Sequence, residues 1–381
     1  MRSRKLSKRI EFWQTSNVSD GFGGNTVLET FITKSWAEII TLNDTNRSTD
    51  IGITSATNTI KIRLRKRNDI RYNSINQFIK YRGAKYIIKN QPFNVDFRDD
   101  TIEIIAVKEE IKTVEDIAPF ITTWRTTIDN ESITIPTSLT AVYNYNITTS
   151  DNQTFTNITG DKTITFSTAG DYDIYISGTF PSIKFNNNGD KDKIIDIKQW
   201  GDIVWSSFQD SFFGCNNLIG TYIDYPNSRS VTNMNRAFKD CVSFIGKTYD
   251  WDVSNVEVMG NMFFNAESFN SDLSNWDVSN VSNMNNMFCQ ASNFNQNISS
   301  WNIVYVYQMN LLMQNTNLSN NNYNSILIGW VETIDKFVLE GGNYNATPSP
   351  HFGNAVCSGQ GLGAKNKLIN KYGWVITDGT P

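Results

Sequence analysis

Side chains able to carry out chemistry are few and scattered in this sequence of 381 residues. The single histidine, His351, lies in the Pro-rich stretch ATPSPHFG and has no acidic or cysteine neighbour. His-ligated metal sites and Ser-His-Asp catalysis both need a histidine beside defined partners, so this composition argues against them. We find no nucleophile–base pair, no metal cluster and no phosphate loop. The sequence therefore predicts a protein that is not an enzyme and has no cofactor.

Cationic side chains are the other candidates for chemistry. KIRLRKR (61–67) puts Arg63 and Arg65 on one face of an expected strand, with Arg67 after them. Such a row can contact DNA phosphates or an acidic neighbour, but its ordinary interpretation is a solvated strand face. Residues 1–112 hold 20 Lys+Arg and 13 Asp+Glu, a net of +7, and the remainder holds 14 and 25, a net of −11. This split indicates two parts with different partners.

The N-terminal part has the pattern of β structure. Alternating and β-branched runs recur at 9–13, 26–40, 57–65, 76–83, 84–90 and 101–109. Six strands separated by polar turns predict a small β-barrel. The connection at 42–57 is long and polar, and long loops in compact barrels are usually functional.

A repeat dominates the second half of the chain. WDVSNV occurs at Trp251 and again at Trp276, 25 residues later. Within each repeat, Met, Phe and a small residue at offsets of 0, 4 and 7 predict a short helix, and the alternation around WDVSNV predicts a short strand before it. One unit cannot bury its own apolar face, so about five units predict a stacked solenoid. Its expected core is Met234, Phe238, Trp251, Met259, Phe263, Trp276, Met284, Phe288 and Trp301.

Polar and sulfur-containing positions of the repeat leave alternatives open. The exposed positions are rich in Asn and Ser, and Asn ladders can satisfy backbone groups at turns or bind sugar hydroxyls. Asn255 and Asn280 are the candidates for facing a glycan, although the structural role is favoured. Cys215 and Cys241 share one column, so a disulfide is geometrically conceivable. Alanine fills that column in the next two units, which favours small buried thiols.

Segments on both sides of the repeats also have readable patterns. SITIPT, YNYNI, TFTNIT, KTITFS and DYDIYISG are short alternating runs that predict a small β-sandwich. After the repeats, residues 321–332 read as a helix, 336–342 as a strand, 361–373 as a helix ended by Gly373, and WVITDG as a final strand. These last elements would cap the solenoid.

The residues W-D-V-S-N-V…N-M…M-F…A…F-N resemble the BspA-family surface repeats, a leucine-rich-repeat-like group common in bacterial surface proteins. PFITTW (119–124), residues 176–203 and residues 364–380 look like the flanking segments of that family, so the resemblance covers about 119–380. It implies adhesion without known catalysis. AGDYDIYISG resembles the last strands of polycystic-kidney-disease-type (PKD-like) domains. The acidic turn typical of that fold is replaced by TTSDNQ (148–153), which argues against a metal there.

Over residues 1–110, R-I-E-F, D-G-F-G-G, S-W-A-E-I, T-I-K-I-R-L-R, I-K-Y-R-G-A-K-Y-I-I and D-x-x-T-I-E-I-I-A-V follow in order. They resemble the phage head–tail joining family, also called head-closure or stopper proteins. The family implies a homo-oligomeric ring of six or twelve copies, between a portal-bound adaptor and the tail or tail-completion protein. Its long inter-strand loop points into the DNA channel and helps retain the packaged genome. That role would fall here on Asp44, Asn46, Arg47 and Asp50.

Together these features predict a multidomain protein. It would join a small β-barrel (1–112), a PKD-like β-sandwich (113–190), an α/β leucine-rich-repeat-like solenoid (191–330) and a solenoid cap (331–381). We expect a structural protein of the virion neck, made in the host cytoplasm, whose outward repeats decorate the particle and contact host surface glycans. No apolar run approaches 18 residues, so we expect no membrane partner. The alternative is a bacterial surface adhesin of the BspA type, against which the lack of a signal peptide and the joining-type barrel argue.

Overall fold

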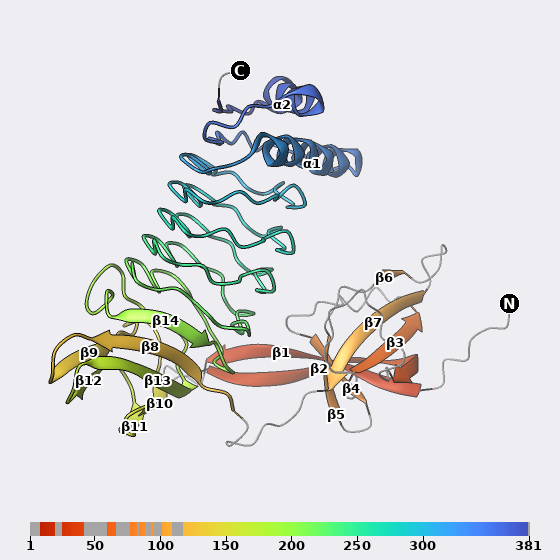
Figure 1. The fold of residues 1–381 in the computed structure, drawn as a ribbon. Helices are drawn as coiled ribbons and strands as arrows, with labels where there is room; N and C mark the ends of the chain where they lie inside the picture. The colour runs from red at the N-terminus through yellow and green to blue at the C-terminus, as the bar shows by residue number, and fades with distance from the viewer. Residues whose placement is uncertain are drawn as a thin grey trace. The chain divides into compact units, whose positions relative to one another are not determined.

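The structure is a computed structural model that describes residues 8–19, 25–41, 59–65, 77–81, 84–88, 93–94, 101–108 and 117–379. The chain divides into two compact units, Met1–Glu115 and Asp116–Pro381. Both units contain antiparallel sheets among their described residues, and the helices α1 and α2 lie near the end of the chain (Figure 1). The expectation of a mainly β protein with several parts therefore agrees with the structure.

The described residues of the first unit form one antiparallel sheet. Its strands are β1 (Lys8–Ser19), β2 (Asn25–Thr41), β3 (Thr59–Arg65), β4 (Gln77–Tyr81), β5 (Ala84–Ile88), β6 (Phe93–Asn94) and β7 (Thr101–Lys108). The order is β3-β2-β1-β4-β5-β7-β6, and β3 also pairs with β7, so six of the strands follow one another in a cyclic order. Ile60, Ile62 and Leu64 of β3 are buried, because alternate side chains of a strand point to the same face. Each of the six expected runs overlaps with one of these strands, and among the described strands only the two-residue β6 was not expected.

The second unit begins with two antiparallel sheets. Its strands are β8 (Phe120–Thr126), β9 (Glu131–Ile135), β10 (Asn144–Thr149), β11 (Thr154–Ile158), β12 (Lys162–Phe166), β13 (Gly170–Thr179) and β14 (Ile194–Gln199). One sheet has the order β11-β10-β13-β8-β14, and the other pairs β12 with β9. Ile133 and Phe166 of the small sheet share one core with Trp124 and Ile174 of the large one. The five short runs that the sequence predicts between the N-terminal part and the repeats are therefore strands.

Strand β14 joins these sheets to the repeats. Along one edge it pairs with β8. Along its other edge, the carbonyls of Ile195 and Ile197 accept hydrogen bonds of 3.0 Å from the N–H groups of Ile219 and Thr221, which belong to the first coil. An open sheet edge would expose unpaired backbone groups, and here the first coil covers it. The sheet thus forms the base on which the coils stack (Figure 1).

Hydrogen bonds between coils hold the repeats together. The N–H groups of Met234, Met259 and Met284 donate to carbonyls of the following coil over 2.8, 2.9 and 2.7 Å. Parallel bridges link Asn233 to Val258, Val258 to Asn283 and Asn283 to Gln308. Each coil therefore satisfies its backbone through its neighbours, as expected for stacked repeats that cannot fold singly.

The repeats contain neither the expected short helix nor the expected short strand. Residues 206–318 form turns and isolated bridges, and Ala237 N–H donates to the Met234 carbonyl three residues back. The φ is positive at two equivalent positions of every coil, which interrupts any right-handed helix. In the later coils these residues are Arg236, Asp240, Asn261, Asn265, Asn286, Gln290, Leu311 and Asn315. The helix prediction was wrong because a 0, 4, 7 spacing can also arise from a chain of turns.

The apolar columns form one continuous core inside the stack. Phe263 stacks on Phe238 at 5.8 Å and on Phe288 at 5.9 Å between ring centroids. Trp276 Nε1 donates to the Thr248 carbonyl at 2.7 Å, so the indole also bonds to the preceding coil. All of the predicted core residues are at most 3% exposed, namely Met234, Phe238, Trp251, Met259, Phe263, Trp276, Met284, Phe288 and Trp301.

Two helices close the far end of the stack. α1 (Asn320–Leu339) and α2 (Gly359–Tyr372) correspond to the two predicted helices. The predicted Gly373 caps the end of α2 with a φ of 72°. The strand predicted at 336–342 is wrong, because α1 continues to Leu339 and packs Phe337 against Tyr305. The final predicted strand is reduced to one bridge between His351 and Thr377.

The four cysteines are free thiols. Cys241 is buried, and its Sγ–H donates to the Phe212 carbonyl at 2.9 Å. Burial raises the pKa of both Cys215 and Cys241 above the ordinary thiol value. Both side chains therefore act as small buried groups of the core, the interpretation that their column favoured.

Candidate functional site

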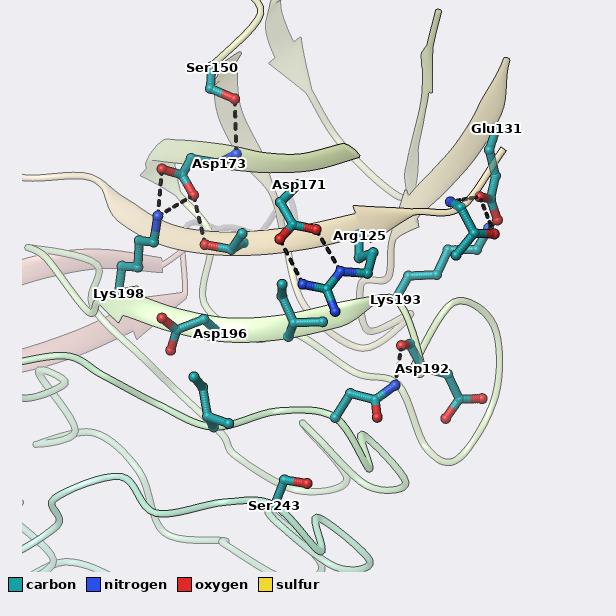
Figure 2. Close-up of a pocket in the computed structure, with 15 residues that line it drawn as sticks. Arg125, Glu131, Ser150, Asp171, Asp173, Asp192, Lys193, Asp196, Lys198 and Ser243 are labelled. Atoms are coloured by element: carbon teal, nitrogen blue, oxygen red, sulfur yellow. Dashed lines mark hydrogen bonds and ion pairs between the residues drawn. The ribbon is translucent and has the colours of Figure 1, made fainter. Parts of the chain in front are cut away.

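A charged groove of about 880 Å³ lies between the large sheet of the second unit and the first coils (Figure 2). Alternate residues of neighbouring strands place their side chains on the same face, so β8, β13 and β14 all contribute. The groove contains the acidic residues Glu131, Asp171, Asp173, Asp192 and Asp196 and the basic residues Arg125, Lys193 and Lys198. Five acidic and three basic groups give it a net charge of −2.

Ion pairs within the groove occupy most of these charges. Arg125 donates from Nε and Nη2 to the two carboxylate oxygens of Asp171 over 2.7 and 2.8 Å. Lys198 Nζ contacts both oxygens of Asp173 at 2.8 and 2.9 Å, and Thr123 Oγ1 donates to the same carboxylate. The Arg125 hydrogen bonds lower the pKa of Asp171, and the bond to Asp173 raises the pKa of Lys198. In both pairs the carboxylate oxygens are thus already occupied by a basic side chain.

The most buried carboxylate of the groove has a structural role. Asp196 accepts hydrogen bonds from Gly220 N–H, Thr221 N–H and Thr221 Oγ1 over 3.1, 2.8 and 2.6 Å. These donors belong to the first coil, whereas Asp196 belongs to β14. A buried carboxylate with three donors is well satisfied, so this contact fixes the coil stack to the sheet.

The pH dependence of stability should report on another carboxylate of the groove. Glu131 has its pKa lowered from 4.5 to about 2, first by the hydrogen bond from Thr127 N–H and then by Lys193. Because the folded pKa is lower, this stabilisation is complete above the unfolded pKa of about 4.5 and is lost as the pH falls towards 2. We expect the melting temperature of the native chain to fall more steeply from pH 5 to pH 3 than that of Glu131→Gln. Thermal unfolding of both proteins between pH 5 and pH 3 measures this difference. If their melting temperatures fell equally with pH, the lowered pKa of Glu131 would be contradicted.

The charged groove does not contain an arrangement of side chains that is typical of catalysis. Its residues provide ion pairs but no nucleophile beside a free base. Across the described part of the chain, no group of three or more His, Cys, Asp or Glu side chains could hold a metal ion. The charge and the pairing suit a rigid junction, and a net negative groove disfavours anionic ligands.

In the first unit, one of the three arginines considered for contact with DNA or a neighbouring copy lies beside a carboxylate. Arg63 of β3 is opposite Glu103 of β7, and its Nε donates to Glu103 Oε2 at 2.7 Å. Lys61 Nζ contacts the other oxygen of Glu103 at 2.7 Å. Glu103 is only 2% exposed, so this triad is largely internal to the sheet. Within this geometry the Arg63 side chain holds β3 to β7.

Two family models match parts of the chain. Residues 1–110 match the phage head completion protein family. Residues 206–326 match a second family, described as a Mycoplasma protein of unknown function, DUF285, whose repeats are BspA-like. Both resemblances noted in the motifs are therefore confirmed.

Two solved structures are similar to part of this chain. One is protein SF1141 from Shigella flexneri 2a, at 24% identity and a TM-score of 0.24. The other belongs to the virion of a native gene transfer agent particle, at 17% identity and a TM-score of 0.23. Each match covers 29% of this chain and all of the other chain. No curated protein matches the sequence.

The head completion match coincides with the first compact unit, Met1–Glu115, and the repeat match lies inside the second. The head completion match supports a structural protein of a phage particle. The matched families are described as a phage head completion family and a repeat family of unknown function, and neither description names a reaction. Among the described helices, none is both long and apolar enough to span a membrane.

The remaining predicted sites divide into two groups. Asp44, Asn46, Arg47, Asp50, Arg67 and the side chain of Arg65 lie outside the described residues. Asn255 and Asn280 lie on the coils, where their Nδ2 groups donate to the carbonyls of Arg229 and Ser254 over 2.8 and 2.6 Å. These amide donors therefore hold adjacent coils together, which is the structural alternative.

Sequence reasoning missed the charged groove. Its charged members come from β8, β9, β13, β14 and the loop before β14, and only the fold brings them together. The available signal was a pair of charges at alternate positions in GDYD (170–173) and in DIK (196–198), together with the single charge in WRT (124–126). Alternation of this kind shows that the charges share a face, but it does not show which strands are neighbours.

Proposed function

We propose that this chain is a head-closure component of the neck of a tailed phage. Its first unit would form part of the connector between head and tail. Its second unit would extend outward as a decoration that binds glycans on the host surface. The observation that carries the proposal is the match of residues 1–110 to the phage head completion family, which spans almost the whole first unit.

The strand arrangement of the first unit is compatible with this role. The pairing of β3 with both β2 and β7 places six strands in a cyclic order, which we interpret as the small barrel expected of a head-closure protein. Copies of this barrel would assemble as a ring of six or twelve. The ring would contact a portal-bound adaptor on one side and a tail or tail-completion protein on the other.

Genome retention is part of the same proposal. The connection at 42–57 would line the channel and approach the packaged DNA. Its polar residues Asp44, Asn46, Arg47 and Asp50 suit a solvated channel. Arg65 and Arg67 are the remaining candidates for contact with phosphate or with a neighbouring copy, since Arg63 pairs with Glu103.

The alternative function is a bacterial surface adhesin of the BspA type. The match of residues 206–326 to the BspA-like repeat family favours it. An adhesin would not need a head completion unit at its N-terminal end, so we prefer the virion role.

Deletion of the gene from the phage genome tests the connector role. We expect DNA-filled heads and separate tails to accumulate, because the joint between them is missing. Supplying residues 1–112 alone should restore tailed particles, whereas residues 113–381 alone should not. Electron microscopy of the lysates distinguishes these products. Normal numbers of tailed virions in the complete absence of the gene would refute the proposal.

A further inference from the structure

One face of the coil stack is polar and almost uncharged. The parallel bridges through Asn233, Val258, Asn283 and Gln308 bring equivalent residues of successive coils side by side. Among the residues around these bridges, Glu257 is the only charged one. We call this surface the bridged face. It consists of the outward side chains of residues 204–209, 230–235, 255–260, 280–285 and 305–310.

The last coil adds two exposed aromatic rings to the bridged face. Tyr305 is 49% exposed and Tyr307 is 56% exposed, where the preceding coil has Asn280 and Ser282. Tyr305 packs edge-on against Phe337 of α1, with ring centroids 5.9 Å apart. The N–H of Tyr307 donates to the Ser282 carbonyl at 3.0 Å, which fixes the backbone beneath its ring. The two tyrosine rings thus expose flat apolar surface to solvent beside polar side chains.

The side-chain amides next to these rings are fixed in position, and some of their N–H groups have no described acceptor. Asn285 Nδ2 donates to Gln308 Oε1 at 3.2 Å, and Asn283 Oδ1 accepts from Asn285 N–H at 2.9 Å. No described group accepts a hydrogen bond from Asn283 Nδ2 or from Gln308 Nε2. A ligand could use these donors without breaking a contact of the stack, and their fixed position lowers the entropy lost on binding.

We propose that the bridged face binds a neutral oligosaccharide at its α1 end. One sugar ring would stack on Tyr307, and its hydroxyl oxygens would accept hydrogen bonds from Asn283 and Gln308. A sugar ring has an apolar face of C–H groups and an edge of hydroxyls, which matches an aromatic ring flanked by amides. Nucleic acids and anionic glycans need cationic partners, and the single charge on this face is the carboxylate of Glu257. The assignment rests on the proposed decorating role of the second unit and places it on defined residues.

Binding of the full chain to immobilised oligosaccharides tests this assignment. The probes are neutral chains of glucose, galactose and N-acetylglucosamine, together with sialylated and phosphorylated counterparts. We expect at least one neutral chain to bind, with little change between 50 and 500 mM salt because no charge pair contributes. Tyr307→Ala should weaken this binding about tenfold or more. Tyr249→Ala, which removes a tyrosine that is 41% exposed elsewhere on the coils, should leave it unchanged.

Three results would overturn the assignment: no binding to any neutral chain, binding only to the anionic chains, or equal binding by the native chain and Tyr307→Ala. If Tyr307→Ala and Tyr249→Ala have equal melting temperatures, misfolding is excluded as the cause of a loss of oligosaccharide binding. Phage carrying Tyr307→Ala should still assemble tailed particles. Failure of the glycan assay therefore remains distinct from failure of the connector role, which the gene deletion tests separately.

Discussion

Replacement of Phe263 by alanine is expected to lower the free energy of unfolding of the second unit by about 3–5 kcal/mol. Phe263 is completely buried in the middle of the coil stack. Its ring stacks on Phe269 with 3.8 Å between centroids, and it also contacts the equivalent rings, Phe238 and Phe288, of the coils on both sides. The cavity would therefore interrupt contacts in three successive coils, and the hydrogen bonds between coils oppose its collapse.

Phe264 provides the matched control for this substitution. It is the adjacent residue, partly exposed, and its ring lies 4.4 Å from Lys239 Nζ. Phe264→Ala should cost about 1 kcal/mol, mainly the lost cation–π contact. Urea unfolding followed by tryptophan fluorescence measures both, because most tryptophans belong to the second unit. Equal destabilisation by the two substitutions would show that the stacked rings are not the core of the coils.

Replacement of Gly201 by alanine is the second large effect, with an expected loss of about 3 kcal/mol. Gly201 follows β14 and has a φ of 64°, which costs a residue with a side chain about 1–2 kcal/mol. A Cβ there would lie 2.3 Å from the Pro119 carbonyl oxygen and 2.4 Å from that of Ala118. The backbone before β8 would have to move away from this Cβ. That movement would weaken the two hydrogen bonds that join Asp202 to Ala118, each of which contributes about 1 kcal/mol to stability.

Gly189→Ala is the control for Gly201→Ala, because it introduces the same backbone strain without the steric clash. Its φ of 60° is nearly the same, but a Cβ at Gly189 would meet no atom within 4 Å. Gly189→Ala should therefore cost only about 1 kcal/mol, the strain alone. The urea midpoints of the two variants give the comparison. If Gly201→Ala were no more destabilising than Gly189→Ala, the close approach of residues 118–119 to the turn after β14 would be contradicted.

The repeat period and the strand runs could be predicted because both depend on local pattern. Identical hexapeptides 25 residues apart at Trp251 and Trp276 indicate one stacked unit, whatever its backbone. The backbone itself could not be derived. Offsets of 0, 4 and 7 fit a helix, but positive φ at residues such as Asn261 and Asn265 converts the segment into turns. Asn tolerates this conformation, and that tolerance was the available clue.

The functional surfaces were harder to predict than the fold. Asn255 and Asn280 were chosen because they repeat, yet repetition also marks the amides that bond one coil to the next. Tyr305 and Tyr307 do not repeat, and their significance depends on exposure that only the folded coil reveals. Arg63 was a reasonable DNA contact from its neighbours in sequence, but its partner Glu103 is 40 residues away. Long-range partners of this kind require the strand order.

The central claim is that this chain lies at the junction of head and tail, and imaging of purified virions tests it most directly. Cryo-electron microscopy should compare virions carrying the full chain with virions carrying only residues 1–112. We expect a ring of density in the neck in both samples, and outward density at the neck that is lost with residues 113–381. Density at the tail tip, or virions that lack the chain altogether, would contradict the account.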